Sequence, residues 1–234
     1  MSIAENLADV RRRVAEAARR AGRSPDEVTL VAVSKTFSVD AVREAWAAGQ
    51  RDFGENKVQE ALQKIDRTPD IRIRWHLIGH LQSNKAKRAA AAFACIHSVD
   101  SVDLVRKLDA AASGAAPPVT PEVLVQVDLA GETTKFGAPE EEARRCLHAA
   151  LEARSLKLAG LMIIPPWNED QEQTRPWFKR LRALRDRLVQ GGVPAQALRQ
   201  LSMGMSHDFE AAIEEGSTLV RVGTAIFGKR QARP

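Results

Sequence analysis

The sequence predicts an α/β protein, a single (β/α)8 barrel with one extra N-terminal helix, spanning residues 1–234 as one domain. Eight strand-like stretches alternate with helical stretches almost from end to end, and few of them contain a hairpin signal. A chain of 234 residues suits one such barrel. We find no linker between two domains and no internal repeat. An open, doubly wound parallel sheet is the alternative fold.

Most of the expected strands are short apolar runs bounded by polar or glycine residues. They cover residues 28–34, 51–54, 72–79, 95–100, 122–130, 156–164, 198–204 and 217–228. Because helices separate them, the strands need crossover connections and therefore pair in parallel.

The intervening stretches have helical spacing. The start, MSIAENLADVRRRVAEAARRAG, alternates charge with alanine and predicts an amphipathic helix rather than a secretory signal. In the next helix we expect Ser38 to be the N-cap and Gly49 to mark the end. Further helices are expected at 56–65, 102–112, Pro139–Arg154 and 208–216. In addition, an alanine-rich helix should begin at about Ser83, and a long helix after the sixth strand should end near residues 190–192.

The composition excludes several classes of protein. Hydrophobic residues make up 44% and charged residues 28%, which is typical of a globular protein with a substantial core. No apolar run approaches the roughly 18 residues that span a bilayer, so we expect no membrane association. The cysteines, Cys95 and Cys146, form neither a disulfide framework nor a close-spaced metal pair, which favours a reducing cytoplasm.

The net charge of +5 raises the hypothesis of nucleic-acid binding. The basic residues, however, alternate with acidic ones in RRRVAEAARR and KRLRALRDRL, a pattern typical of solvated helix faces. Trp46, Trp167 and Trp177 lie among helical or loop residues, where we expect packing or surface roles. We therefore predict no nucleic-acid partner.

A pair of histidines at helical spacing raises the question of a metal site. His76 and His80 are four residues apart in HLIGH, like a zinc pair on a helix. This segment begins in a predicted strand and contains Gly79, so the two rings need not share a face. We predict no metal site.

Lys35 follows the first predicted strand, in LVAVSKT. In a barrel, active groups lie at the C-terminal ends of the strands. A lysine amine that is partly desolvated there has a lowered pKa, and its neutral form attacks aldehydes to give a Schiff base. Taken alone, this stretch favours a lysine whose amine simply extends into water.

Two later strand ends predict a phosphate site. SMGMS contributes the hydroxyls of Ser202 and Ser206, and RVGTA contributes Arg221, Gly223 and Thr224. Backbone N–H groups in glycine-containing turns bind phosphate, and barrel phosphate sites are frequently built after strands seven and eight. Each segment could instead be a tight turn that needs glycine. Together with Lys35, they predict a site for an aldehyde that carries a phosphate.

Motifs along nearly the whole chain carry a family resemblance. LVAVSKT, FGENKVQE, WHLIGHLQSNK, HSVDS, GLM and LSMGMSHDFEAAIEEGSTLVRVGTAIFG resemble the pyridoxal 5′-phosphate homeostasis protein family. That family shares the barrel of the alanine racemase N-terminal domain, the fold-type III barrel. The resemblance implies that this chain holds pyridoxal 5′-phosphate (PLP), a form of vitamin B6, as an internal aldimine on Lys35.

The resemblance also implies the other cofactor-binding residues. Arg221 is expected near either the ring nitrogen or the phosphate, and Asn56 and Met203 in direct contact with the cofactor. His80 and Asn84 are expected near the face of the ring. The residues expected around the phosphate are Ser202, Ser206, Gly223 and Thr224.

The sequence favours a carrier over an enzyme. Racemases with this barrel use two bases, the cofactor lysine and a tyrosine from a second domain. This sequence contains no tyrosine, and it ends at Pro234, directly after the predicted barrel. We therefore expect a monomer that buffers PLP or delivers it to apoenzymes, without efficient catalysis. The alternative is a PLP-dependent racemase or lyase that uses another side chain as its second base.

Overall fold

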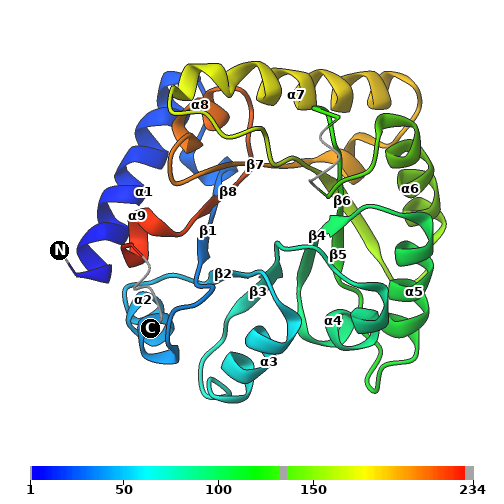
Figure 1. The fold of residues 1–234 in the computed structure, drawn as a ribbon, viewed down its shortest axis with the longest axis horizontal. Coiled ribbons are helices and arrows are strands. Elements are labelled where there is room, and N and C mark those ends of the chain that lie inside the picture. Colours follow the sequence, from blue (N-terminus) through cyan, green and yellow to red (C-terminus); the bar gives the residue numbers. More distant parts are fainter. Residues whose placement is uncertain (1, 132–135, 230–234) are drawn as a thin grey trace.

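The computed structural model describes residues 2–131 and 136–229. Eight parallel strands close into a barrel in the order β1 to β8, with β8 paired to β1 (Figure 1). The (β/α)8 prediction is thereby confirmed, and the open-sheet alternative is wrong. The strands are β1 (Thr29–Val33), β2 (Asp52–Glu55), β3 (Arg74–Leu77), β4 (Cys95–Val99), β5 (Glu122–Gln126), β6 (Lys157–Met162), β7 (Gln200–Met205) and β8 (Leu219–Val222).

Helices surround the barrel on its outer side (Figure 1). The α-helices are α1 (Ile3–Arg20), α2 (Val39–Ala47), α3 (Val58–Asp66), α4 (Ala86–Ala92), α5 (Val102–Ser113), α6 (Glu140–Glu152), α7 (Arg175–Gln190), α8 (Phe209–Glu214) and α9 (Thr224–Phe227). Short 3-10 turns lie at Pro25–Glu27, Ser83–Lys85, Gln171–Gln173 and Ala195–Leu198. Within the described residues, no helix has both the length and the apolar character that crossing a membrane requires.

The extra N-terminal helix α1 is specified by its own ends and by its buried face. Ser2 and Glu5 form a capping box, in which each side chain accepts a hydrogen bond from the other residue's backbone N–H. Leu7 and Val10 are fully or almost fully buried on one face. The amide of Asn6 also donates to the carbonyl of Ile226 at 2.9 Å, which ties α1 to α9 (Figure 1).

The apolar runs extend beyond the strands that they predict. Ile78, Val127 and Ile163 follow the ends of β3, β5 and β6, yet all three remain buried. Hydrophobicity alone therefore overestimates the strand length, because the apolar run continues into loops that remain inside the protein. The predicted strand at 217–228 is corrected in the same way, because β8 ends at Val222 and α9 begins at Thr224.

Gly160 in β6 allows an unusually close approach of β7. A Cβ atom at this position would lie 1.8 Å from the carbonyl oxygen of Gln200. The pairing register between β5 and β6 also shifts here, since Leu124 faces Gly160 whereas Val123 faces Leu158. The glycine is thus required by the backbone of the next strand and not by its own φ angle.

We expect Gly160→Ala to lower the free energy of unfolding by at least about 3 kcal/mol, because backbone atoms cannot move aside as a flexible side chain can. The measurement is urea unfolding followed by circular dichroism. Gly191→Ala is the control, since Gly191 ends α7 with φ −78° and open space apart from the last helical turn. This control should stay within about 1 kcal/mol of the parent protein. Equal stability of both variants would contradict the close approach of β6 and β7.

Candidate functional site

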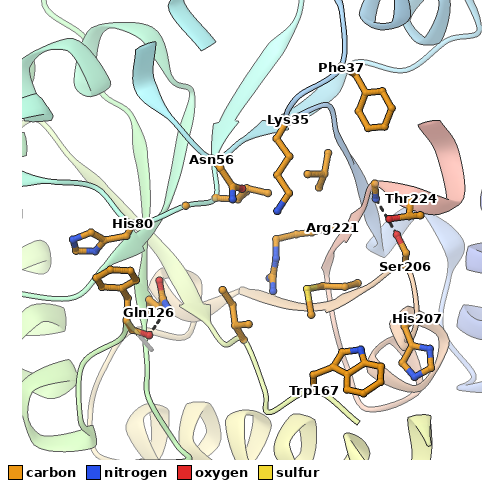
Figure 2. A pocket seen from close by; sticks show the side chains of 17 residues that line it. Lys35, Phe37, Asn56, His80, Gln126, Trp167, Ser206, His207, Arg221 and Thr224 are labelled. Carbon is orange, nitrogen blue, oxygen red and sulfur yellow. Dashed lines mark hydrogen bonds between the residues drawn. The ribbon is translucent and has the colours of Figure 1, made fainter. Parts of the chain in front are cut away.

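A cavity of about 540 Å³ opens at the end of the barrel where the strands terminate. Its walls come from residues that follow or end β1, β2, β3, β5, β6, β7 and β8, so residues distant in sequence meet there. Lys35, Asn56, Arg221 and Thr224 are among the lining residues, and Figure 2 shows their side chains around the same space.

Lys35 lies two residues beyond the end of β1, and its side chain extends into the cavity (Figure 2). The peptide groups on either side of it are held by α3. The ammonium of Lys64 donates to the carbonyl of Ser34 at 2.7 Å, and the carboxylate of Glu60 accepts from the N–H of Thr36. Thr36 has φ +71°, a strained conformation for a β-branched residue. Lys64 and Glu60 thus form a clamp on the backbone on either side of Lys35, and this clamp holds that backbone in a conformation that it would not adopt alone.

The clamp is built around a buried ion pair. The Nζ of Lys64 lies 2.6 Å from Oε1 of Glu55, and both side chains are buried. Burial raises the pKa of the Glu55 carboxyl, while the ammonium of Lys64 acts in the opposite direction. The same Oε1 accepts a hydrogen bond from the hydroxyl of Ser34 at 2.7 Å. Losing the charge of Lys64 would leave Glu55 without its counter-ion in a buried position, whereas Lys64 has a second carboxylate, that of Glu60, at 3.1 Å.

The turn after β7 and the turn after β8 form one polar corner of the cavity. The hydroxyl oxygen of Ser206 accepts from the N–H of Gly223 at 3.0 Å and from that of Ala225 at 3.4 Å. Both acceptor positions of this oxygen are therefore used, and its proton remains available for donation. The hydroxyl of Thr224 lies beside it (Figure 2). Hydroxyl donors in a turn of this kind suit an anion.

Arg221 occupies the inner end of the cavity and is buried. Its Nη1 donates to the hydroxyl of Ser202 at 2.6 Å, and its Nη2 donates to the carbonyl of Ile163 at 2.9 Å. Burial lowers the pKa of the guanidinium to about 10, which leaves it charged at neutral pH. It therefore places a positive charge at the inner end of the cavity.

The wall across the cavity from Ser206 and Thr224 is flat and aromatic (Figure 2). The ring of His80 stacks on Phe136 with their centroids 3.8 Å apart and their planes 8° from parallel. The Nδ1 of His80 lies 3.4 Å from a carboxylate oxygen of Asp100, and the amide of Gln126 donates to the carbonyl of Phe136 at 2.6 Å. This wall can border a planar ligand.

Large apolar side chains surround the mouth of the cavity. Trp167 is 70% exposed, Phe136 58% and Ile164 37%. His207 lies next to Trp167 at this edge, and its Nε2 is buried without a hydrogen-bond partner among the described residues (Figure 2). The cavity is thus open to solvent, with large apolar side chains at its mouth.

Most of the predicted site residues line this one cavity, but three do not. Ser202 lies beneath Arg221, and the exposed Asn84 lies in a 3-10 turn away from the cavity. Met203 faces the opposite way from its neighbour Ser202 and packs in the hydrophobic core outside the barrel wall. The register of β7 shifts between Ser202 and Met205, so Met205 is not on the side of the strand that Met203 faces. Met205 takes the place in the wall that was expected of Met203. The predicted residues that do line the cavity are Lys35, Asn56, His80, Ser206, Arg221, Gly223 and Thr224.

Sequence reasoning missed part of the wall. Trp167, expected to be a packing or surface residue, lines the cavity, as do Phe37, Gln126 and Phe136. Gln126 could have been found, since it is the last residue of β5. No sequence signal indicates Phe136, which reaches the cavity from a loop.

Both cysteines lie away from solvent. Cys95 and Cys146 are free thiols with buried side chains. Burial raises the pKa of both, that of Cys146 to about 12. Neither is therefore a thiolate at neutral pH.

This fold and site define a (β/α)8-barrel protein whose cavity at the strand ends is built around a lysine and an arginine. The model of the family "Alanine racemase, N-terminal domain" matches residues 6–231. Two similar relatives, from Aquifex aeolicus and Pseudomonas aeruginosa, are both named pyridoxal phosphate homeostasis protein. The first is 41% identical and covers 99% of this chain and 100% of its own. The second is 45% identical and covers 98% and 96%.

The chain belongs to the pyridoxal phosphate homeostasis protein family. Among solved structures it is similar to PipY of Synechococcus elongatus with PLP bound, at 39% identity and a TM-score of 0.85, over 97% of this chain and all of that one. An alanine racemase of Clostridium difficile shares the fold at 15% identity and a TM-score of 0.70, over 97% of this chain and 60% of the racemase.

We expect Lys64→Met to lower the free energy of unfolding by about 3–5 kcal/mol, because Glu55 is then buried without its counter-ion. The measurement is equilibrium unfolding in urea. The control is the double variant Glu55→Gln with Lys64→Met, which removes both charges and should recover a large part of the loss. A double variant no more stable than Lys64→Met would contradict the ion-pair interpretation.

Proposed function

We propose that this chain binds PLP reversibly at the barrel mouth and takes part in keeping its intracellular concentration constant, without efficient catalysis. The observation that carries the proposal is that Lys35, Arg221 and Ser206 line one cavity. Ser206 lies in the turn after β7, called the Ser206 turn below, and is hydrogen-bonded to the N–H of Gly223. The names of the curated relatives and the PLP-bound structure of PipY support it.

The residues present suit this cofactor. PLP supplies an aldehyde, which condenses with the neutral amine of a lysine and releases water. Lys35 would provide that amine, and the two hydroxyls of Ser206 and Thr224 would hold the phosphate. The aromatic wall of His80 and Phe136 suits a planar ring.

Several features favour a carrier over a racemase or lyase. Carbanion chemistry on the cofactor benefits from the exclusion of water, whereas Trp167 and Phe136 at this mouth are largely exposed. The sequence contains no tyrosine to act as the second base of a racemase. Because a free aldehyde reacts with many amines, a protein that sequesters it has a clear chemical use. Delivery to apoenzymes and a monomeric state are further parts of this proposal.

We expect Lys35→Ala to abolish covalent attachment of PLP. After borohydride reduction of the loaded protein, peptide mapping should find the cofactor on Lys35 of the parent chain and on no residue of the variant. The variant should keep phosphate-anchored binding, weaker by roughly tenfold or more. Lys57→Ala is the matched control, because Lys57 is exposed and adjacent to Asn56 but does not line the cavity.

An adduct on any other lysine would overturn the assignment of Lys35, and no adduct on the parent chain would overturn the function. Rapid racemisation of L- or D-amino acids by the loaded protein would favour the enzyme alternative. Slow loss of cofactor to those amino acids would agree with a carrier.

The Ser206 turn predicts a preference for the phosphorylated ligand. We expect Ser206→Ala to weaken binding of PLP by about tenfold, since a charge-assisted hydrogen bond contributes roughly 1.5 kcal/mol or more. Binding of pyridoxal, which lacks the phosphate, should change less than about twofold. Titrations monitored by visible absorption measure both. Equal losses for the two ligands would show that Ser206 does not contact the phosphate.

A further inference from the structure

A continuous chain of hydrogen bonds crosses the interior of the barrel and ends at Arg221. From Arg221 it passes to the hydroxyl of Ser202 at 2.6 Å, and from that oxygen to Nδ1 of His97 at 2.8 Å. The Nε2 of His97 lies 2.9 Å from Nδ1 of His76, whose own Nε2 lies 2.8 Å from a carboxylate oxygen of Asp52. The five residues come from five different strands, and Ser202, His97, His76 and Arg221 are buried.

The chemistry of its two ends gives the chain a single direction. A guanidinium only donates, so the oxygen of Ser202 accepts from Arg221. At the other end the carboxylate of Asp52 only accepts, so with both rings neutral the direction is fixed from there, and the hydroxyl of Ser202 donates to Nδ1 of His97. His97 then carries its proton on Nε2 and donates it to Nδ1 of His76. His76 in turn carries a proton on Nε2 and donates it to Asp52. Reversing the direction would point a lone pair of His76 at the carboxylate.

Both imidazoles are neutral in this arrangement. Burial is the main cause that lowers the pKa of His76 and, further still, that of His97. Each ring then has one donor and one acceptor, and the chain uses both on each ring. All four ring nitrogens are therefore occupied. Although Cys95 lies close to the two rings, no imidazole lone pair remains to bind a metal.

We propose that His97 and His76 are positioning residues that hold the guanidinium of Arg221 in one orientation at the inner end of the cavity. They act through Ser202, which accepts from Nη1 of Arg221, while the carbonyl of Ile163 accepts from its Nη2. Insofar as Arg221 contacts bound PLP, this inference rests on the proposed function. Ser202 is then a support of the site and not a phosphate ligand.

Neutral supports have an electrostatic consequence. A carboxylate bound directly to Arg221 would neutralise its charge toward the cavity. The hydrogen-bonded series places its own acidic group, Asp52, three side chains away from the guanidinium, and the charge of Asp208 acts on Arg221 without a hydrogen bond between them among the described residues. The orientation of Arg221 is fixed, and its positive charge still faces an incoming anion.

The first experiment needs no ligand. Long-range ¹H–¹⁵N spectra of the parent protein should show His76 and His97 neutral, with the proton on Nε2, from about pH 6 to pH 8, a range that spans the ordinary histidine pKa. In the same sample, the Nη protons of Arg221 should give separate, slowly exchanging signals that merge in His97→Phe and in Ser202→Ala. A proton on Nδ1 of either ring, a cationic ring, or unchanged Arg221 signals in the variants would overturn the proposal.

The second experiment is a double-mutant cycle on the affinity for PLP. His97→Phe should weaken binding of PLP about tenfold in the parent protein but less than about twofold in the Arg221→Met variant. The reason is that the effect of His97 on binding passes through Arg221. Equal losses in both backgrounds would show that His97 acts independently of Arg221, and would overturn the proposal. Ser202→Ala replaces His97→Phe if the latter does not fold, and His148→Phe on the exposed face of α6 is the control.

The two experiments separate the two proposals. If the parent protein does not bind PLP, the proposed function fails, whereas the ligand-free spectra still decide whether the histidines position Arg221. If it binds PLP and the spectra show the opposite proton positions, the function stands and this inference fails.

Discussion

The pairing of the first strand with the last is the constraint on which the site depends. β1 and β8 are parallel and in register, with Thr29 opposite Leu219 and Ala32 opposite Val222. This pairing closes the barrel and brings Lys35, beyond one strand, beside Gly223, beyond the other. A Cβ atom at residue 223 would lie 3.2 Å from the carbonyl oxygen of Val33, tighter than side-chain contacts usually are. A glycine therefore lets the two strand ends approach closely enough to share one cavity.

The two basic side chains of the cavity, Lys35 and Arg221, are held by different means. The backbone around Lys35 is fixed from outside the barrel wall, by an ion pair between β2 and α3. Arg221 is fixed from inside the barrel, by neutral hydrogen-bonding groups. The first arrangement acts on the main chain on either side of Lys35, through the carbonyl of Ser34 and the N–H of Thr36. The second keeps a permanent charge in place, because a guanidinium stays protonated even when it is buried.

The sequence was sufficient to predict the barrel and the strand ends that carry Lys35, Ser206 and Thr224. These positions could be found because polar residues follow apolar runs, a local pattern. The exact strand ends could not, since Ile78 and Val127 remain buried in loops. The chain through His76 and His97 requires the relative register of neighbouring strands, which a single sequence does not contain. The same lack of register explains why Ser202 was expected at the phosphate and not beneath Arg221.

The burial of both thiols determines which nucleophiles an aldehyde can meet in this molecule. A thiolate adds to aldehydes as readily as an amine does, and an accessible one would compete with lysine for such a ligand. Cys95 is enclosed by the barrel, and Cys146 lies on the buried face of α6. A molecule held in the cavity would thus meet amines of this chain but neither of its two thiols, which stay protonated and out of reach.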